Sequence, residues 1–366
     1  MMLTIFNEEM QIIGMIGQFK SLTRTKRFYA PGDIKLYVQA TKKNSDLLKS
    51  KKRIHVEGTN EIYIIETARM EKQEKGLEYI QVNGRSAECL IERRICWERI
   101  KETKITYEDL MRKIVNDNCV NPADSKRKIP GLYMGERKGY SEILDIQKSF
   151  GNALNAIMEN AEEGELGFRC RFDPKTRMLY FEVLRGIDRT DSQSTNKKAV
   201  FSRDLMNVVE QNYTDTIRDY ANCALIGGQG QDDERIMTEI GTELSGLQRF
   251  EIFVDANDIS KKKDDNTEMS DADYKKLLKQ RGMAKLSEKK RVQTLDGTYR
   301  VNGKVYDVDC GDIVTVYDEK WSVYMDTQIT EIATTCEKGA PIKKSITFGK
   351  KAAQPLDELE KLKKGR

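Results

Sequence analysis

Several groups of residues in this chain of 366 residues have side chains or spacings that could support chemistry. The run Gly227-Gly228-Gln229-Gly230 follows a strand-like segment, as a phosphate-binding loop would. It lacks the Gly-Lys-Ser/Thr ending of a P-loop, and the two consecutive acids Asp232 and Asp233 behind it would repel an anion. We therefore predict a hairpin turn at this run.

The closely spaced acids Asp307, Asp309 and Asp312 raise the question of a calcium loop. An EF-hand loop ends on glutamate at its twelfth position, whereas that position holds Asp318 here. The apolar run Ile-Val-Thr-Val after Asp312 is typical of a strand. We predict a strand and no metal site.

Hydrolytic chemistry would need a carboxylate pair or a nucleophile with a base. Glu162, Glu163 and Glu165 offer neighbouring acids, but their sequence position favours a solvated helix end. The single histidine, His55, begins a strand-like run, and we expect it at a surface or strand edge. The sequence therefore predicts no catalytic, cofactor-binding or metal-binding residue, although an acid-pair hydrolase stays open as an alternative.

The cysteines are scattered and odd in number. They are Cys89, Cys96, Cys119, Cys170, Cys223, Cys310 and Cys336. A secreted disulfide scaffold would have an even, clustered set, and none of these has CxxC spacing. We expect reduced, half-buried thiols in a protein made in the cytoplasm.

Composition narrows the class further. Charged residues make up 33% and hydrophobic residues 38%, and the net charge of +4 is too small to indicate a nucleic-acid binder. No apolar run approaches the roughly 18 residues of a membrane-spanning helix. The first residues lack a basic region, so we expect no signal peptide. The basic run Lys42–Arg53 lacks aromatics and favours a solvated loop or short helix.

The elements that position these residues are mostly β. Residues 3–100 contain several short strand-like runs, which favours a barrel or sandwich. Near the C-terminus, Ile313–Tyr317, Val323–Ile332 and Ile342–Phe348 predict a three-stranded meander. A hairpin turn is expected after Met70, and a break near Leu295-Asp296-Gly297.

Helical periodicity begins after residue 103. Thr106 with Asp109 resembles a capping box ahead of one helix, and a second helix is expected from Ser141 to Ala161, with Gly164 just beyond it at C′. The segment between the two helices, which includes Pro130, is predicted to be a loop.

An alternating apolar pattern then predicts a hairpin packed on a helix, with Leu166, Phe168, Cys170 and Phe172 inward. Further on, Lys261–Asn266 is expected to be a charged linker. Ser270 is expected to cap a helix that runs to about Lys289 and buries Tyr274, Leu277, Leu278 and Leu286.

Taken together, these segments resemble the siphophage tail-hub family, related to the N-terminal part of tail-associated (Tal-type) baseplate proteins. The resembling segments are IFNEEMQIIGMIGQFKSLTRTKRFYAPGDIKLYV, VNGRSAECLIERRICW, RKIPGLYMGERKGY, FEVLRGIDRT, YANCALIGGQG, LQRFEIFVDANDIS, KQRGMAKLSEKKRVQTLDG, DVDCGDIVTVYD and TQITEI. They span most of the chain and contain turns, strand ends and caps, not catalytic motifs.

The resemblance implies a β-rich α+β fold with two barrel-like, tube-forming β domains and an inserted helix–hairpin α+β domain. The expected divisions are a first barrel-like domain at 1–103 with return strands at 196–255, an insert at 104–195, a linker and helix at 256–290, a second barrel-like domain at 291–350, and a flexible charged tail at 351–366.

The function that the resemblance implies is a non-enzymatic hub of a tail tip, assembled as a trimer and closing or gating the tail tube. Expected partners are other copies of the chain, the distal tail ring protein, the tape-measure protein and fibre or receptor-binding proteins, with DNA only in transit. No cofactor is expected. The protein would reside in the virion or a phage-like particle after synthesis in the bacterial cytoplasm. The alternatives are a tail protein that binds host cell-wall saccharide and a peptidoglycan hydrolase.

Overall fold

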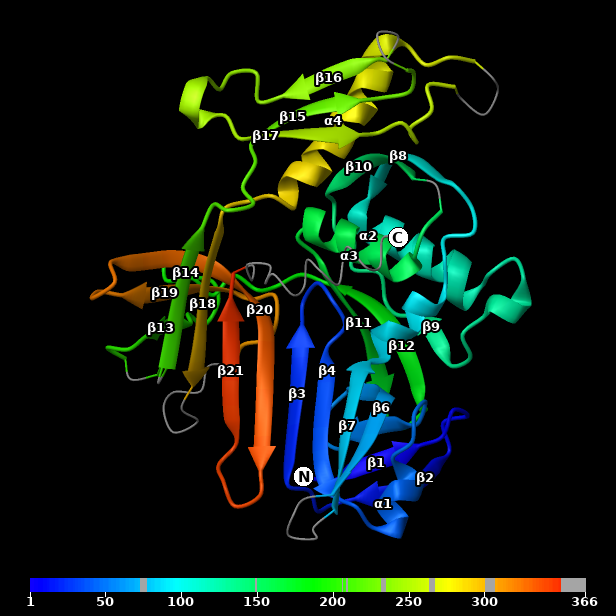
Figure 1. The fold of residues 1–366 in the computed structure, drawn as a ribbon, viewed down its shortest axis with the longest axis vertical. Helices are drawn as coiled ribbons and strands as arrows, with labels where there is room; N and C mark the ends of the chain where they lie inside the picture. Colours follow the sequence, from blue (N-terminus) through cyan, green and yellow to red (C-terminus); the bar gives the residue numbers. More distant parts are fainter. Residues whose placement is uncertain are drawn as a thin grey trace.

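The computed structural model describes residues 1–72, 78–148, 150–205, 207–208, 210–231, 235–262, 267–299 and 307–349. The turn predicted after Met70 and the linker predicted at Lys261–Asn266 lie partly outside these residues, and the predicted tail 351–366 lies wholly outside them. The fold is α+β and β-rich, as predicted, and one large sheet runs through its centre (Figure 1).

The first β unit comprises residues 3–86. Its elements are β1 (Leu3–Phe6), β2 (Ile12–Ile16), β3 (Ser21–Arg27), β4 (Asp33–Gln39), α1 (Lys42–Leu47), β5 (Arg53–Val56), β6 (Ile62–Lys72) and β7 (Glu78–Ser86). The strands pair antiparallel in the order β3-β4-β7-β6-β5-β1-β2. In β4, the buried Ile34, Leu36 and Val38 alternate with polar residues, so one face of the strand enters the core. The predicted β-rich start is confirmed, and the basic run contributes the short helix α1.

The second β unit contains β13 (Val200–Ser202), β14 (Glu210–Thr216), β18 (Val292–Tyr299), β19 (Ile313–Asp318), β20 (Val323–Glu337) and β21 (Lys343–Phe348). The last three form the predicted meander, and β20 also pairs with β3, which joins both units in one sheet. Within the segment expected to return to the first domain, 196–255, β13 pairs with β19 and β14 with β18. The break predicted at Leu295-Asp296-Gly297 is wrong. β18 continues through it because β14 and β21 supply hydrogen bonds on both sides.

The insert, residues 87–184, lies between the two β units in the chain. Its elements are η1 (Ala87–Arg93), β8 (Ile100–Thr106), α2 (Tyr107–Val115), the π-helical turn η2 (Asn116–Val120), η3 (Ser125–Arg127), β9 (Leu132–Met134), β10 (Ile143–Lys148), α3 (Ala153–Glu163), β11 (Gly167–Asp173) and β12 (Met178–Leu184). The Thr106 hydroxyl accepts a hydrogen bond from the Asp109 amide (3.0 Å) and begins α2 as predicted. β11 and β12 form the predicted hairpin, and Phe168, Cys170 and Phe172 are buried.

Some local predictions in the insert are wrong. The helix expected from Ser141 starts only after Asn152, whose side chain caps α3, because the preceding segment pairs with β8 as strand β10. The expected loop contains β9, which pairs parallel to β12. Gly164 is the C-cap of α3 with φ −82°, and the left-handed residue is Glu165 with φ +52°.

The small unit packs one helix on a three-stranded sheet, at the top of Figure 1. It contains β15 (Cys223–Gly227), β16 (Met237–Ile240), η5 (Gly246–Gln248), β17 (Glu251–Asp255) and α4 (Asp271–Ser287). The Ser270 hydroxyl caps α4 as predicted, accepting from the Asp273 amide (3.1 Å), and Tyr274 and Leu278 are fully buried against the sheet. Among the described helices of the chain, none is long and apolar enough to cross a membrane.

Phe28 lies where the first β unit, the insert and the second β unit meet. Its side chain is 2% exposed, and a Cβ added at Gly167 or Gly311 would come within 2.3 or 2.2 Å of the Phe28 ring. The Phe28 amide donates to the Thr330 carbonyl (3.1 Å), and its carbonyl accepts from the Phe168 amide (3.3 Å). One aromatic side chain therefore contacts glycines from both neighbouring units.

Candidate assembly surfaces

One side of the large sheet is polar across eight strands. We call it the open face: the side of β14, β18, β21, β20, β3, β4, β7 and β6 that carries Thr23, whose strands lie side by side in Figure 1. Residues directly opposite each other on neighbouring strands share a face. One row across the sheet is Thr67, Asn83, Lys35, Thr23, Thr335 and Lys343. A second row is Arg69, Gln81, Tyr37, Ser21 and Glu337.

Some charges on the open face are paired within it, whereas Lys35 and Lys343 have no carboxylate within salt-bridge distance in the described chain. Arg27 on β3 contacts Asp33 on β4 (2.5 Å) and Glu331 on β20 (2.9 Å), so one guanidinium links three strands. The hydroxyls of Thr23 and Thr335 form a hydrogen bond of 3.1 Å across the strand pair that joins the two β units. The surface therefore has mixed charge and small hydroxyl side chains.

An aromatic pair lies where β3, β4 and β7 come together. The rings of Tyr37 and Tyr79 stack with their centroids 4.8 Å apart and an interplanar angle of 14°. The Lys20 ammonium lies 5.0 and 4.9 Å from the two ring centroids, which is cation–π geometry. Sequence reasoning did not identify this cluster, because the three residues come from separate strands or their ends.

Beneath the open face, β3 directs charges toward the opposite side. Arg24 and Lys26 contact Glu61 at 2.5 and 3.2 Å, and the Tyr63 hydroxyl donates to Glu61 (2.7 Å). Burial raises the pKa of the Glu61 carboxyl, but Lys26 and Arg24 outweigh burial and keep it below its usual value. The negative charge of Glu61 is therefore balanced by the positive charges of Arg24 and Lys26, and these contacts hold β3 against the segment that leads into β6.

The glycine run at 227–230 forms the predicted turn between β15 and the antiparallel β16. A Cβ at Gly228 would lie 2.6 Å from the Tyr274 hydroxyl oxygen, and that oxygen accepts a hydrogen bond from the Gln229 amide (2.8 Å). Close packing on α4 therefore explains the glycine.

The acids near β19 bind protein donors. Asp312 accepts from the Ile187 amide (2.9 Å) and the Arg189 guanidinium (2.7 Å). Asp318 accepts from Arg203 (2.6 and 2.7 Å) and the Trp321 amide (2.9 Å), and its pKa is lowered mainly by the bond from Arg203. In the described part of the chain, no group of three or more His, Cys, Asp or Glu residues could hold a metal ion.

Glu163, one of the candidate acids, and the histidine His55 both make contacts within the fold. Burial raises the pKa of Glu163, although a hydrogen bond from Tyr107 acts in the opposite direction. The prediction of a surface or strand-edge His55 is wrong: it is 5% exposed on β5, which pairs on both sides. Its Nδ1 lies 2.8 Å from the Glu61 carbonyl oxygen, and its ring meets Phe172 edge-on.

All seven cysteines are free, as predicted, but the expected half-burial is wrong for six of them, which are buried; Cys310 is half-buried. Burial raises the pKa of Cys89 and Cys119 to about 12, which keeps these thiols protonated and unreactive. Each tryptophan lies beside a guanidinium: Arg127 is 4.7 Å from the Trp97 ring centroid and Arg203 is 4.8 Å from that of Trp321.

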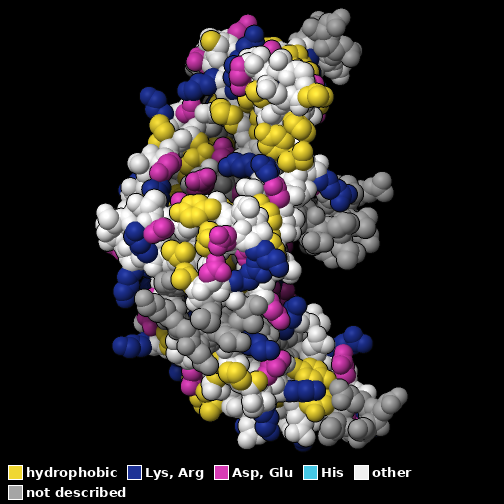
Figure 2. All heavy atoms as spheres, turned by 90° about the vertical axis from the view of Figure 1, so that its left-hand side faces the viewer, with side chains coloured by type: hydrophobic (Ala, Val, Ile, Leu, Met, Phe, Trp, Pro, Cys, Tyr) yellow, Lys and Arg dark blue, Asp and Glu magenta, His cyan; other side chains and the backbone are white. Residues whose placement is uncertain are grey.

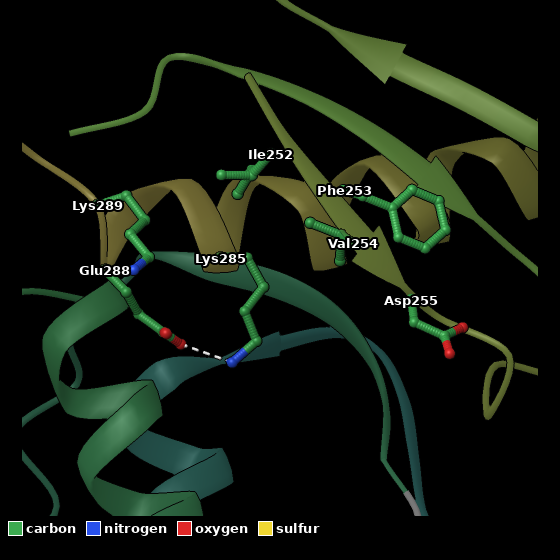
Figure 3. Close-up of a pocket in the computed structure, with 7 residues that line it drawn as sticks. All are labelled: Ile252, Phe253, Val254, Asp255, Lys285, Glu288 and Lys289. Atoms are coloured by element: carbon green, nitrogen blue, oxygen red, sulfur yellow. Dashed lines mark hydrogen bonds and ion pairs between the residues drawn. The ribbon is translucent and has the colours of Figure 1, made fainter. Parts of the chain in front are cut away.

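A shallow hollow of about 250 Å³ lies beside β17 and the end of α4 (Figure 3). Its lining residues are Ile252, Phe253, Val254, Asp255, Lys285, Glu288 and Lys289. The side of the molecule in Figure 2 shows basic and acidic side chains interspersed with apolar ones, so no field of a single sign covers that side.

Comparison with solved structures shows the same fold in phage tail proteins. The chain matches a tail protein from Neisseria meningitidis MC58 with a TM-score of 0.58 and 12% identity, covering 95% of this chain and 96% of that one. It matches prophage tail protein gp18 from Listeria monocytogenes EGD-e with 0.56 and 12%, covering 99% and 98%. A 43 kDa tail protein of prophage MuSo2 from Shewanella oneidensis gives 0.59 and 12%, covering 95% and 98%. The fold is therefore that of phage-type tail proteins.

The chain belongs to the family of Siphovirus ReqiPepy6 Gp37-like proteins, whose family model matches residues 2–350. The comparison with curated protein sequences gave no match. The resemblance to siphophage tail proteins that the sequence indicated is confirmed, and the family gives the chain a structural role in a phage tail.

Proposed function

We propose that this chain is the hub of a phage tail or tail-like particle, assembling as a trimer beneath the distal tail ring with the open face toward the channel. The observation that carries the proposal is the open face itself, a polar surface eight strands wide built by two β units. A solvated sheet face is polar in a monomer too, so the supporting feature is that this face continues from one β unit to the other across the β3–β20 pair, as the wall of a channel would.

The edges of this surface support closure into a ring. β14 is the last strand at one end, and the described strands offer it no second neighbour. At the other end, β5 pairs only with the start of β6, so the later part of β6, residues 66–72, pairs only with β7 in the described chain. Two unpaired edges on one sheet allow head-to-tail pairing of identical subunits, which closes a ring without leaving an aggregation-prone edge.

The open face also suits the passage of DNA. A channel wall with unpaired lysines and arginines would bind phosphates strongly and slow their movement. Here Arg27 is neutralised by Asp33 and Glu331, and hydroxyls such as that of Thr23 separate the charges. Lys35 and Lys343 are unpaired in the described chain but lie on separate strands, so they form no dense basic patch. We infer transient contact with the tape-measure protein first and DNA later.

Cysteine cross-linking in purified tails tests this arrangement. Thr214→Cys on β14, combined in turn with Thr67→Cys, Arg69→Cys or Glu71→Cys on β6, should give oxidised species that end at three chains. The matched control combines Thr214→Cys with Lys35→Cys in the middle of the open face and should give none. Tails that contain the chain but give no cross-link with any β6 position would contradict ring closure through these edges.

We infer further that the chain acts without catalysis, since Asp312 and Asp318 serve as acceptors for protein donors. Zymography on host cell wall tests this inference. A cleared band from the purified chain would overturn it and favour the hydrolase alternative.

A further inference from the structure

The outer edge of β17 is a second surface with an unused strand edge. The small sheet has the order β16-β15-β17, and β17 runs parallel to β15. No strand in the described chain pairs with the other side of β17. An edge of this kind is a template for one more strand.

The hydrogen bonds between β17 and β15 show which backbone groups of β17 point away from β15. The Phe250 carbonyl accepts from the Cys223 amide (3.1 Å), and the Ala256 amide donates to the Gly227 carbonyl (2.8 Å). In a parallel ladder, the even-numbered residues of β17 therefore bond to β15. The N–H and C=O groups of Phe253 and Asp255 consequently point outward.

The hollow lies along this edge because α4 covers mainly β15 and β16. Three of the four charged side chains of the hollow are paired: Lys285 with Glu288 (2.9 Å; dashed in Figure 3) and Asp255 with Arg235. In the described chain, the Lys289 ammonium has no carboxylate within salt-bridge distance. An occupant of the hollow would therefore be favoured by one carboxylate near Lys289.

The opposite side of the small sheet has two exposed apolar side chains among acidic ones, since register places Glu239, Glu251 and Asp255 on the same side, and the Arg235 guanidinium lies 5.4 Å from the Phe253 ring centroid. Phe253 is 56% exposed and its register partner Leu225 is 46% exposed, while their neighbours Ile226 and Val254 are buried against α4. A strand added beside β17 would place alternate side chains next to Phe253 and the others over the hollow.

We propose that the β17 edge binds an extended segment of a neighbouring tail protein by strand addition. The segment is about five residues long, the length of β17, with apolar side chains toward Phe253 and an acidic one toward Lys289. This inference rests on the proposed tail location. It names a docking site away from the ring edges, which involve β14 and β6.

Amide hydrogen exchange resolved to single residues tests the docking site in the full-length chain, free and in purified tails. In the free chain the amides of Phe253 and Asp255 should exchange quickly and those of Ile252 and Val254 slowly. In tails, the first two should slow by about 100-fold as they gain partners. Before the exchange data are interpreted, an immunoblot of the same tails shows whether they contain the chain. Absence of the chain from the tails would refute the proposed function itself. If the chain is present but its Phe253 and Asp255 amides exchange as in the free chain, the docking site is refuted.

Two variants at one position separate docking from folding. Phe253→Pro removes an outward amide and leaves the ladder to β15 intact, whereas Phe253→Val keeps the amide and removes the ring. Both should melt close to the unmodified chain. In tails, protection of the Asp255 amide should disappear with Phe253→Pro and persist with Phe253→Val. Equal protection in both variants would overturn strand addition, as would protection of these amides in the free chain.

Discussion

Replacing Gly186 by alanine is the sharpest test of how the insert is joined to the second β unit. A Cβ at this position would lie 1.6 Å from the Gly311 carbonyl oxygen and 2.1 Å from its carbon, both of them backbone atoms. Rotation of a side chain cannot relieve such a contact. The two segments would have to separate by about 2 Å to reach ordinary contact distance.

That separation would break the hydrogen bonds that hold the segments together. The Ile187 amide and the Arg189 guanidinium donate to Asp312 at 2.9 and 2.7 Å, and the Ile313 amide donates to the Ile187 carbonyl at 3.0 Å. A neutral hydrogen bond contributes about 1 kcal/mol and one to a charged group about 1.5–3 kcal/mol, so we expect Gly186→Ala to cost about 4–7 kcal/mol. A whole domain is stable by only about 5–15 kcal/mol.

Urea unfolding followed by Trp321 fluorescence measures this cost. A Trp97→Phe background leaves Trp321, in the second β unit, as the sole tryptophan. The matched control is Gly339→Ala, where φ is +80° and no atom lies within 4 Å of the added Cβ. Backbone conformation alone should cost that variant about 1 kcal/mol. If Gly186→Ala loses no more free energy of unfolding than Gly339→Ala, the steric reasoning is wrong.

Three other substitutions test the buried contacts. Phe28→Ala should lose about 3–5 kcal/mol in the same urea assay, because it empties the space between two units; a loss under about 1 kcal/mol would contradict that role. Burial raises the pKa of Glu88, so its neutral form is favoured in the fold and stability falls as pH rises through that raised pKa. Glu88→Gln should flatten this fall in melting temperature, and an unchanged pH profile would refute the assignment. Arg203 lowers the pKa of Asp318, so its contribution is present above the unfolded-state pKa and is lost as pH falls through the folded-state value. Asp318→Asn should melt several degrees lower at neutral pH, with the difference shrinking in acid; a constant difference would point to a packing effect.

Local patterns predicted the elements that depend on neighbours in sequence. The cap of Thr106 on α2, the hairpin β11–β12 and the meander β19–β21 were all predicted, because each is fixed by alternation, helical period or turn residues nearby. The errors involve strands whose partners are distant. β9, β10 and β18 each form because a remote strand supplies hydrogen bonds, which a local pattern does not reveal.

The division of the chain into domains at the predicted residues stays a prediction. The strand pairs nevertheless show what a linear reading of the sequence missed: β13 and β14 join the second β unit, and the segment after them forms the small unit with α4 before the chain returns as β18. Such an excursion is invisible to periodicity, because both parts have strand-like sequences.

The open face was missed for a related reason. Thr23, Lys35 and Asn83 are unremarkable alone, and only the register of three strands places them in one row. Polar alternation in β3, β4 and β7 was the available signal, but alternation equally describes any solvated sheet. What separates this surface from an ordinary solvated sheet is continuity across the β3–β20 pair, with an unpaired outer edge on β14 and on the later part of β6 in the described chain. The evidence for a function in assembly is therefore the order of the strands, which a local sequence pattern does not reveal. The same reasoning applies to β17, where the exposed Phe253 indicates a docking site because it lies on a strand with an unpaired edge in the described chain.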